Sequence, residues 1–291
     1  MRPLPTLFFA IQRNAKSLAK SFLYRYYPDA IFVLRAWRNR RDFRRLFFFR
    51  QSQMKSKIYG NGSPAVLSGP FAGMKYLNEV CWGPIEPKWL GSYEQELHPI
   101  IASILNSNYA QVLDLGSAEG YYAIGLAMKL PKARVCSYDV DPWARAQQRR
   151  LAALNGVKNI GIGKLCTPHD LQSNLSDRSL LICDIEGGEY ELLDPAKISA
   201  LLKCDILVEL HDRFDMGVTI KSGAQELTRR FSASHKITEV KSAPRNGSSG
   251  PCLVYGRLTD EELVMCMNEH RSMAEQVWLW LEVLPAKPLT T

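Results

Sequence analysis

The sequence predicts an α/β fold, in which helices cover a mostly parallel sheet of seven strands and only the last strand enters antiparallel. Two observations predict this fold. Short apolar runs alternate with amphipathic helical stretches between residues 92 and 258, and strands joined through helices pair in parallel. The last two predicted strands are separated only by a loop at 243–251. That connection permits an antiparallel pair but is too short for a parallel crossover.

The individual elements follow from the spacing of apolar residues. The predicted strands are Gln111–Leu115, Arg134–Asp139, Asn159–Leu165, Leu180–Ile185, Asp205–Leu210, Lys236–Lys241 and Cys252–Leu258. The helical stretches between the first six strands are Gly120–Leu130, Pro142–Leu154, Pro168–Leu175, Glu189–Lys203 and Ser222–Ser232. A further helix is predicted over residues 259–284, because Thr259 and Glu262 have the spacing of a capping box.

The chain divides by composition into four regions. Residues 1–60 are predicted to form a basic helical extension, 61–91 a hairpin or cover, 92–258 the domain that contains the sheet, and 259–291 a C-terminal helix and tail. No apolar run reaches the roughly 18 residues of a membrane-spanning helix. The seven cysteines include no CxxC pair and lie mostly in apolar runs. This pattern predicts buried, reduced thiols and a cytoplasmic protein.

Positive charge is concentrated in the first region. Residues 1–60 contain 14 lysines and arginines against two acidic residues, whereas the remainder contains 23 against 27. The arginines alternate with aromatic residues such as Trp37 and Phe43. Three interpretations stay open: a solvated helical extension, a peripheral contact with an anionic membrane at its inner face, and a nucleic-acid contact. The aromatic residues favour a lipid interface, so nucleic acid is not the expected partner.

A glycine-containing turn follows the first predicted strand. Gly116 and Gly120, with Ser117 between them, let the backbone approach a ligand at the carboxyl edge of the sheet. A dinucleotide would place its pyrophosphate at the start of the next helix, where Glu119 carries a carboxylate. S-adenosylmethionine (SAM) has no phosphate and carries an ammonium and a sulfonium group. Asp114 and Glu119 therefore suit SAM as the cofactor, and the alternative is that the glycines only shape a tight turn.

The second predicted strand supplies a partner for this turn. It ends at Asp139, which lies 23 residues beyond Gly116, where a carboxylate can accept hydrogen bonds from both ribose hydroxyls. Asp141 precedes Pro142 and is predicted first as the N-cap of the following helix.

Four motifs in this order resemble the FkbM-type methyltransferases, which are class I SAM-dependent enzymes with a Rossmann-like sheet. The motifs are Asp114–Tyr122 (DLGSAEGYY), Tyr138–Asp139 (YD), Cys183–Glu189 (CDIEGGE) and Val208–Asp212 (VELHD). The resemblance covers about residues 90–257 and is that of a divergent member, since Val140 follows Asp139 where the family more often has Glu-Pro. It implies O-methylation of a hydroxyl on a saccharide or secondary metabolite.

The resemblance also implies that Tyr93 and Glu94 contact the amino-acid end of the cofactor. Taken by themselves, Ser92 to Gln95 have the spacing of a capping box, which predicts a helix start.

A hydroxyl nucleophile must lose its proton, so a base is expected where the fourth and fifth strands end. The candidates are Asp184, Glu186, Glu209 and His211. The ordinary pKa of histidine, near 6.5, suits His211 as a base at neutral pH, and the alternative is a backbone hydrogen bond at the strand end. Asp184 is also a candidate cofactor contact. Together these carboxylates could bind a divalent metal ion, but they have no histidine at a fixed ligand spacing, so a metal is an open alternative and not the expectation.

Two other functions stay open at this point. One is a non-catalytic protein of the same fold that docks on a membrane or polyanion, and the other is an N-methyltransferase. The fourth strand is followed by Cys183-Asp-Ile-Glu186, and not by the Asn/Asp-Pro-Pro-aromatic run of enzymes that methylate amino groups in nucleic acids. The sequence identifies neither the acceptor nor the oligomeric state.

Overall fold

The structure is a computed structural model that describes residues 38, 41, 49–211, 213–215, 218–220, 223–245, 251, 254–269 and 276–285. The chain divides into two units, Met1–Leu46 and Phe47–Thr291, and every element below belongs to the second. The predictions for the basic extension lie almost entirely outside the described residues. The exception is residues 49–59, which form a helix.

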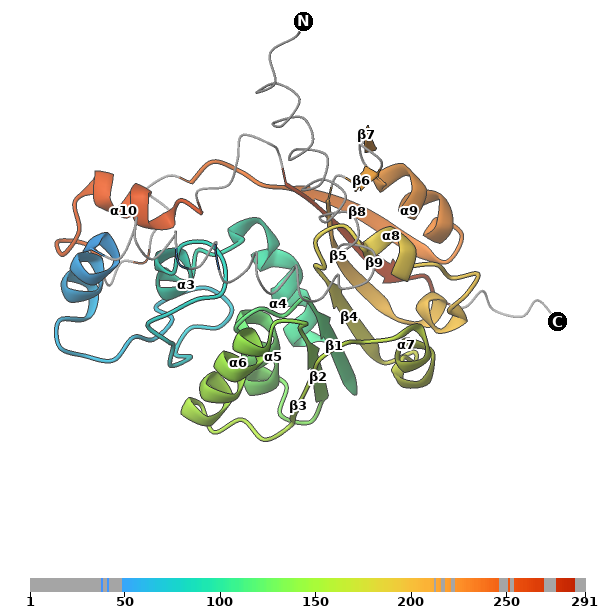
Figure 1. The fold of residues 1–291 in the computed structure, drawn as a ribbon, viewed down its shortest axis with the longest axis horizontal. Helices are drawn as coiled ribbons and strands as arrows, with labels where there is room; N and C mark the ends of the chain where they lie inside the picture. Colours follow the sequence, from blue (N-terminus) through green and yellow to red (C-terminus); the bar gives the residue numbers. More distant parts are fainter. Residues whose placement is uncertain are drawn as a thin grey trace, which may run out of the picture. The chain divides into compact units, whose positions relative to one another are not determined.

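Seven strands form one sheet in the order β3-β2-β1-β4-β5-β9-β8 (Figure 1). They are β1 (Gln111–Leu115), β2 (Arg134–Tyr138), β3 (Ile160–Gly163), β4 (Ser179–Cys183), β5 (Asp205–Leu210), β8 (His235–Lys241) and β9 (Val277–Val283). β1 to β5 pair in parallel, whereas β9 is antiparallel to both of its neighbours, β5 and β8. The predicted α/β fold, with a mostly parallel sheet of seven strands whose last strand is antiparallel, is confirmed.

The segment that supplies the last strand differs from the prediction. The described residues of Cys252–Leu258 form a turn with one bridge, between Tyr255 and Leu258, and no strand. Helix α10 (Asp260–Met267) begins at the predicted capping box but does not continue to residue 284. No glycine or proline separates it from β9, so the sequence contains no clear stop signal. The β-branched and aromatic residues of β9 instead pair on both sides within the sheet.

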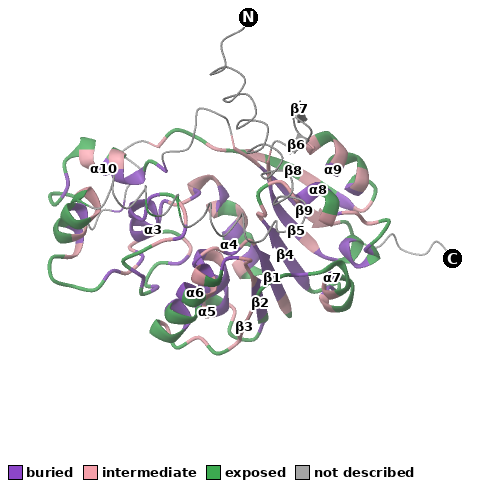
Figure 2. Cartoon of the chain, in the orientation of Figure 1, coloured by how far each residue is buried: buried purple, intermediate pink, exposed green. Residues whose placement is uncertain are grey.

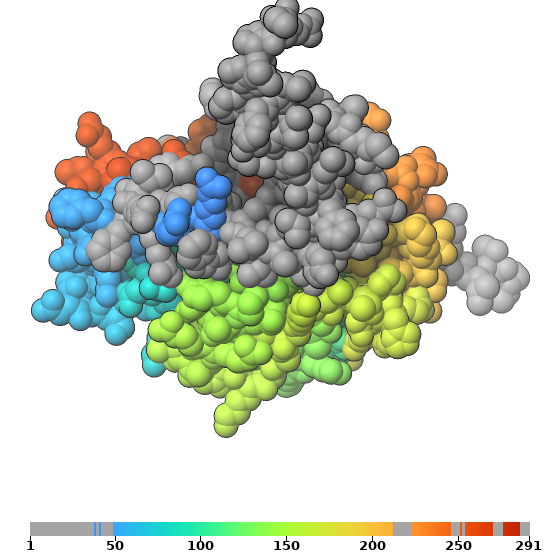
Figure 3. All heavy atoms as spheres, in the orientation of Figure 1, coloured from blue at the N-terminus to red at the C-terminus, as the bar shows by residue number. Residues whose placement is uncertain are grey.

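Helices cover both faces of the sheet. One face packs against α4 (His98–Asn106), α5 (Tyr121–Lys129) and α6 (Pro142–Leu154), and the latter two lie in the green part of the surface in Figure 3. The other face packs against α7 (Pro168–Asn174), α8 (Glu189–Leu192), η2 (Ser199–Lys203) and α9 (Ala224–Phe231). The predicted helix 189–203 is therefore two short helices. Along each central strand, alternate side chains pack into the hydrophobic clusters on the two faces of the sheet. These strands are buried, as Figure 2 shows.

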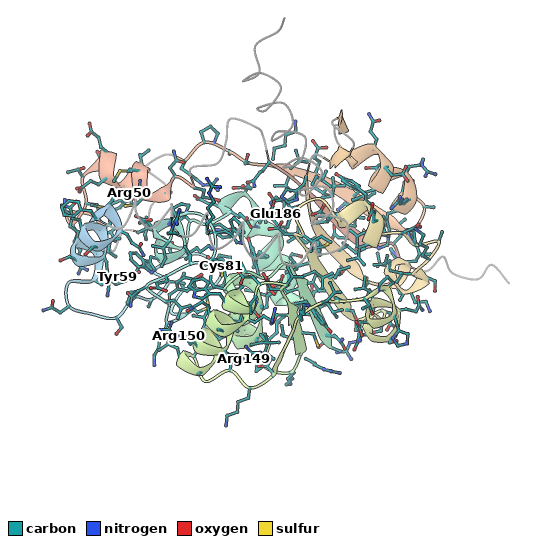
Figure 4. The ribbon with its side chains drawn as sticks, viewed as in Figure 1. Arg50, Tyr59, Cys81, Arg149, Arg150 and Glu186 are labelled. Carbon is teal, nitrogen blue, oxygen red and sulfur yellow. The ribbon has the colours of Figure 1, made fainter. Side chains whose placement is uncertain are left out.

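A group of helices from three distant parts of the sequence lies beside the sheet. It contains residues 49–59, α3 (Glu86–Leu90) and α10, and Arg50 and Tyr59 are labelled there in Figure 4. Arg50 forms an ion pair with Glu86 at 3.3 Å, and α10 packs against α3. The intervening residues 61–91, which we call the cover segment, fold back on themselves through an antiparallel bridge between Ala65 and Lys75.

The remaining observations concern a second sheet, the cysteines and the length of the helices. β6 (Arg213–Asp215) and β7 (Val218–Ile220) form a separate two-stranded sheet after β5. Six cysteines lie within the described residues, and all six are buried and free, as the spacing of cysteines predicts. Among the described residues, no helix combines the length and the apolar character that crossing a membrane requires.

Candidate active site

The turn between β1 and α5 depends on glycine. Gly116 has a φ of 79°, and a Cβ atom there would lie 1.6 Å from the backbone oxygen of Asp184. Only glycine permits this close approach of the β1 turn to the end of β4. Gly120, with a φ of 97°, begins α5, and the hydroxyl of Ser117 donates to the backbone oxygen of Tyr138 at 3.0 Å. The predicted turn is therefore present and is held against the neighbouring strand ends.

Asp139 joins this turn to the end of β2. Its Oδ2 accepts the backbone N–H of Ala118 at 2.9 Å, and its Oδ1 accepts that of Asp141 at 2.7 Å. Burial raises the pKa of Asp139 to about 6. Each carboxylate oxygen keeps a second lone pair for a ligand hydroxyl. Asp141 is the N-cap of α6, because its Oδ1 accepts the N–H of Trp143 at 2.9 Å, as predicted.

Asp114, at the end of β1, is a buried carboxylate with one oxygen unsatisfied. It is 3% exposed, and its Oδ2 has no hydrogen-bond partner. Burial raises its pKa to about 8, and the negative charges of Asp184 and Asp139 add to this effect. Native proteins rarely leave such a buried oxygen without a partner. A positively charged ligand at this position would satisfy it.

Glu94 lies with this group of carboxylates. Its negative charge contributes to the raised pKa of both Asp114 and Asp184, after the larger effect of burial. Glu94 itself is 1% exposed and has a left-handed φ of 46°. Its Oε2 accepts the hydroxyl of Tyr122 at 2.5 Å, and its backbone N–H donates to Oε1 of Glu269 at 3.0 Å. These two hydrogen bonds fix Glu94 to α5 and to the residues that follow α10, and its contact with the cofactor stays a prediction.

The segment before Glu94 differs from the prediction. Ser92 does not cap a helix, because the short helix η1 (Gln95–Leu97) begins after the left-handed Glu94 without a side-chain cap. Tyr93 packs edge-on against Tyr121, with ring centroids 5.2 Å apart. The ammonium of Lys88 lies 4.7 Å from the centroid of the Tyr93 ring. These contacts make Tyr93 a packing partner of the turn.

Glu119 binds the cover segment. It is fully buried and accepts hydrogen bonds from the Tyr76 hydroxyl at 2.8 Å and the Cys81 N–H at 3.0 Å. It also forms an ion pair with Lys88. Burial alone would raise the pKa of Glu119, but Lys88 and the hydrogen bonds lower it. The protein thus already neutralises the carboxylate that the sequence predicts to face the cofactor, and Glu119 fixes the cover segment, where Cys81 is labelled in Figure 4, to the turn.

The four predicted catalytic residues meet where β4 and β5 end. The Nε2 atom of His211 lies 3.7 Å from Asp184 Oδ1, 3.7 Å from Glu186 Oε2 and 4.0 Å from Glu209 Oε1. Glu186, labelled in Figure 4, follows β4 and has a 62% exposed side chain. Asp184 and His211 are less exposed, and Glu209 is buried. We call these four residues the histidine cluster.

Sequence reasoning missed the role of Glu189, which it predicted only as the first residue of a helix. Glu189 is fully buried, and its carboxylate accepts the N–H groups of Ile185 and Gly187, each at 3.0 Å. It also lies 3.1 Å from Nδ1 of His211. Glu189 therefore orients the imidazole and holds the loop after β4. The signal was present in the sequence, since Glu189 is the last carboxylate of the CDIEGGE motif.

The electrostatics of the histidine cluster change the predicted role of His211. Burial lowers its pKa, but Glu189 and Asp184 outweigh burial and raise it to about 9. At neutral pH the imidazole is therefore mostly protonated and is a poor proton acceptor. Burial raises the pKa of Asp184 to about 7, although the neighbouring His211 opposes this effect. Ligand-type atoms of Asp184, Glu186 and His211 lie within 4.8 Å of one another, an arrangement that can hold a metal ion.

Several solved structures are similar in fold. A putative O-methyltransferase from Klebsiella pneumoniae is 14% identical with a TM-score of 0.39, over 65% of this chain and 80% of that one. Precorrin-6y C5,15-methyltransferase from Geobacter metallireducens is 14% identical with a TM-score of 0.41, over 63% and 87%. The O-methyltransferase TomG from Streptomyces achromogenes, in complex with SAM, is 14% identical with a TM-score of 0.39, over 65% and 80%. No protein-family model and no curated protein sequence matches the chain.

Proposed function

We propose that the chain is a SAM-dependent methyltransferase that methylates a hydroxyl oxygen of a small-molecule or saccharide acceptor. The observation that carries the proposal is the unsatisfied Asp114 carboxylate at the carboxyl edge of the sheet, with Asp139, Asp184 and Glu94 around it. Burying an unpaired carboxylate is costly, and a positively charged ligand would remove this cost. SAM carries two positive groups and a ribose, and so matches this set in charge and in hydrogen bonding.

Each part of the cofactor has a partner in this proposal. The ammonium group would bind between Asp114 and Glu94, where the negative charge is most buried. The ribose hydroxyls would bind the remaining lone pairs of Asp139, whose position is fixed by two backbone N–H groups. The backbone from Gly116 to Gly120 would lie against the cofactor, because a glycine carries no Cβ atom to separate them.

Methyl transfer then requires an acceptor oxygen in line with the sulfonium. SAM, when bound, would supply the methyl group to this oxygen and leave as S-adenosylhomocysteine, and the residues of the site would have to take up the proton of the hydroxyl. Alignment alone can supply at most about 7–11 kcal/mol of the barrier reduction. With His211 protonated, Asp184 is the group whose pKa, about 7, suits uptake of that proton near neutral pH. His211 would then stabilise the negative charge that develops on the oxygen.

The finer assignment, to the FkbM-type family and to O-methylation, is supported by the four sequence motifs. The structure brings the residues of the CDIEGGE and VELHD motifs together as the histidine cluster and its partner Glu189. This arrangement offers protonatable groups beside the expected methyl position, as deprotonation of a hydroxyl requires. A cytoplasmic location, with a peripheral membrane contact through residues 1–60, belongs to the same proposal.

Calorimetric titration with SAM and with its demethylated product, S-adenosylhomocysteine, tests the proposal. We expect both to bind to the purified chain, and Asp114→Asn to weaken binding of SAM. Asp177→Asn, which changes an exposed carboxylate between α7 and β4, is the matched control and should bind normally. If the folded chain binds neither compound, the proposal is wrong and a non-catalytic binding protein is the better account. If both compounds bind, mass analysis of a labelled methyl product distinguishes O- from N-methylation.

A further inference from the structure

We propose that Asp184, Glu186 and His211 form a binding site for a divalent cation. The three residues come from the ends of two neighbouring parallel strands, β4 and β5, and their ligand-type atoms lie within 4.8 Å of one another. The His211 Nε2 atom is 3.7 Å from a carboxylate oxygen of each partner. Atoms that share a metal at about 2.1 Å lie about 3.0–3.4 Å apart. The two His211 distances exceed this range by a few tenths of an ångström. The largest separation in the group, within 4.8 Å, would have to shorten by more, and the 62% exposed side chain of Glu186 leaves room for that movement.

The orientation of His211 supports this site independently of the distances. Glu189 is not one of the three proposed ligands. It is fully buried, and its carboxylate accepts hydrogen bonds from the backbone N–H groups of Ile185 and Gly187. It holds Nδ1 of His211 at 3.1 Å and so leaves Nε2 directed at Asp184 and Glu186. A histidine that binds a metal through one nitrogen and a carboxylate through the other is the usual arrangement around protein-bound cations.

The charges of the cluster also favour a cation. Among the described residues, Asp184, Glu186 and Glu189 form ion pairs with His211 and with no lysine or arginine. Glu209 also lies 4.0 Å from His211, so four carboxylates against one imidazole leave an excess of negative charge even when His211 is protonated. The Oδ1 atom of Asp184 is buried and has no hydrogen-bond partner. A dipositive ion would neutralise this excess and satisfy that oxygen, whereas a proton on His211 does neither completely.

The ligand set indicates which cation fits. One imidazole nitrogen and two carboxylates suit Mn²⁺, Fe²⁺ or Zn²⁺ better than Mg²⁺ or Ca²⁺, which prefer all-oxygen ligands. Glu186 is largely exposed, so one side of the site is open to water or to an acceptor oxygen. Such an oxygen would lose its proton more readily when bound to the cation. With the cation bound, His211 would be neutral at Nε2, and the cation would replace its proton in stabilising the developing negative charge. This role rests on the proposed function, whereas cation binding itself does not.

Titration with Mn²⁺ tests the inference in the full-length chain. After treatment with a chelator and its removal, we would add Mn²⁺ and follow the electron paramagnetic resonance signal of the free aqua ion. We expect one equivalent to bind, and Zn²⁺ to displace it. His211→Gln and Asp184→Asn should each weaken binding about tenfold or more. His169→Gln, which removes an exposed histidine on α7, is the control and should bind Mn²⁺ as the unchanged chain does.

A parallel titration with S-adenosylhomocysteine separates this inference from the proposed function. If the chain binds S-adenosylhomocysteine but neither Mn²⁺ nor Zn²⁺, the cation site is wrong and the methyltransferase proposal stands. If it binds Mn²⁺ but no S-adenosylhomocysteine, the cation site stands and the methyltransferase proposal fails. Equal Mn²⁺ affinity in all three variants would place the ion elsewhere and overturn the inference. Far-ultraviolet circular dichroism of each variant checks that it is folded.

Discussion

Two groups of carboxylates, all buried or half-buried, differ in what balances their charge. We call those that face the cover segment and the helices the cover carboxylates, and those at the carboxyl ends of β1, β2 and β4 the edge carboxylates. The cover carboxylates are Glu86, Glu96, Glu119 and Glu269, and the edge carboxylates are Asp114, Asp139 and Asp184. Every cover carboxylate has a lysine or arginine partner. The edge carboxylates have none among the ion pairs of the described residues, apart from the histidine beside Asp184.

The difference teaches which charges serve the fold and which serve a ligand. Lys88 lowers the pKa of Glu119 against the effect of burial, whereas burial dominates at Asp114 and raises its pKa to about 8. Lysine and arginine partners balance the buried charge of the cover carboxylates, so the same kind of partner would be expected at the edge carboxylates if their charge served the fold alone. The unbalanced charge at the sheet edge is therefore best explained by a cationic ligand that supplies the missing partner.

The largest expected effect concerns a cover carboxylate. Lys88→Met would leave Glu119 fully buried without its cation, which should lower the free energy of unfolding by about 3–5 kcal/mol. Urea denaturation measures this loss. Lys197→Met removes an exposed pair with Asp194 and should cost less than about 1 kcal/mol. The double variant Lys88→Met/Glu119→Gln should recover part of the stability. If Lys88→Met lowers the free energy of unfolding by no more than Lys197→Met does, then Lys88 does not balance a costly buried charge, and the contrast between cover and edge carboxylates fails.

The second effect concerns the histidine cluster. His211→Gln removes the imidazole that Glu189 orients, so we expect kcat for methyl transfer to fall about 100-fold. Transfer of a labelled methyl group to a panel of saccharide and metabolite acceptors measures kcat once an acceptor is found. His169→Gln should leave kcat unchanged. Binding of S-adenosylhomocysteine should change less than about threefold in His211→Gln, and a larger loss would mean that His211 contacts the cofactor.

The third effect concerns the ribose position. Asp139→Ala removes both carboxylate oxygens at the end of β2, and we expect about a tenfold or greater loss of SAM affinity. Calorimetric titration measures the change, with Asp177→Asn as the control. The Asp139→Ala variant also loses two backbone hydrogen bonds, so its unfolding free energy must be measured alongside. Unchanged SAM affinity in a stable variant would contradict the role of Asp139 and weaken the proposed function as a whole.

Local patterns predicted most of the sheet and part of the site. β1, β5 and α6 begin and end where the sequence predicts, because each has turn or capping residues at its boundaries. β9 was predicted as the end of a helix. Its apolar residues fit either a helix or a strand, and no glycine or proline before them marks the end of α10. The pairing of Glu119 with Lys88 was missed for a different reason. The two residues are 31 positions apart, and only the folded chain brings the cover segment onto the turn.

The smallest expected effect is a pH dependence that separates Asp114 from the cover carboxylates. Because the pKa of Asp114 is raised to about 8 in the empty site, the folded chain holds a proton that the unfolded chain has released above about pH 4. The contribution of Asp114 to stability therefore decreases as the pH rises between these values. A cationic ligand competes with that proton, so SAM affinity should increase severalfold between about pH 6 and pH 7.5. Asp114→Asn should bind SAM more weakly and with a smaller pH dependence, which comes from Asp139 and Asp184 alone, whose pKa values are about 6 and about 7. If the unchanged chain and Asp114→Asn show the same pH dependence in calorimetric titration, Asp114 does not receive the ammonium group, and the charge that attracts the cofactor lies on another edge carboxylate.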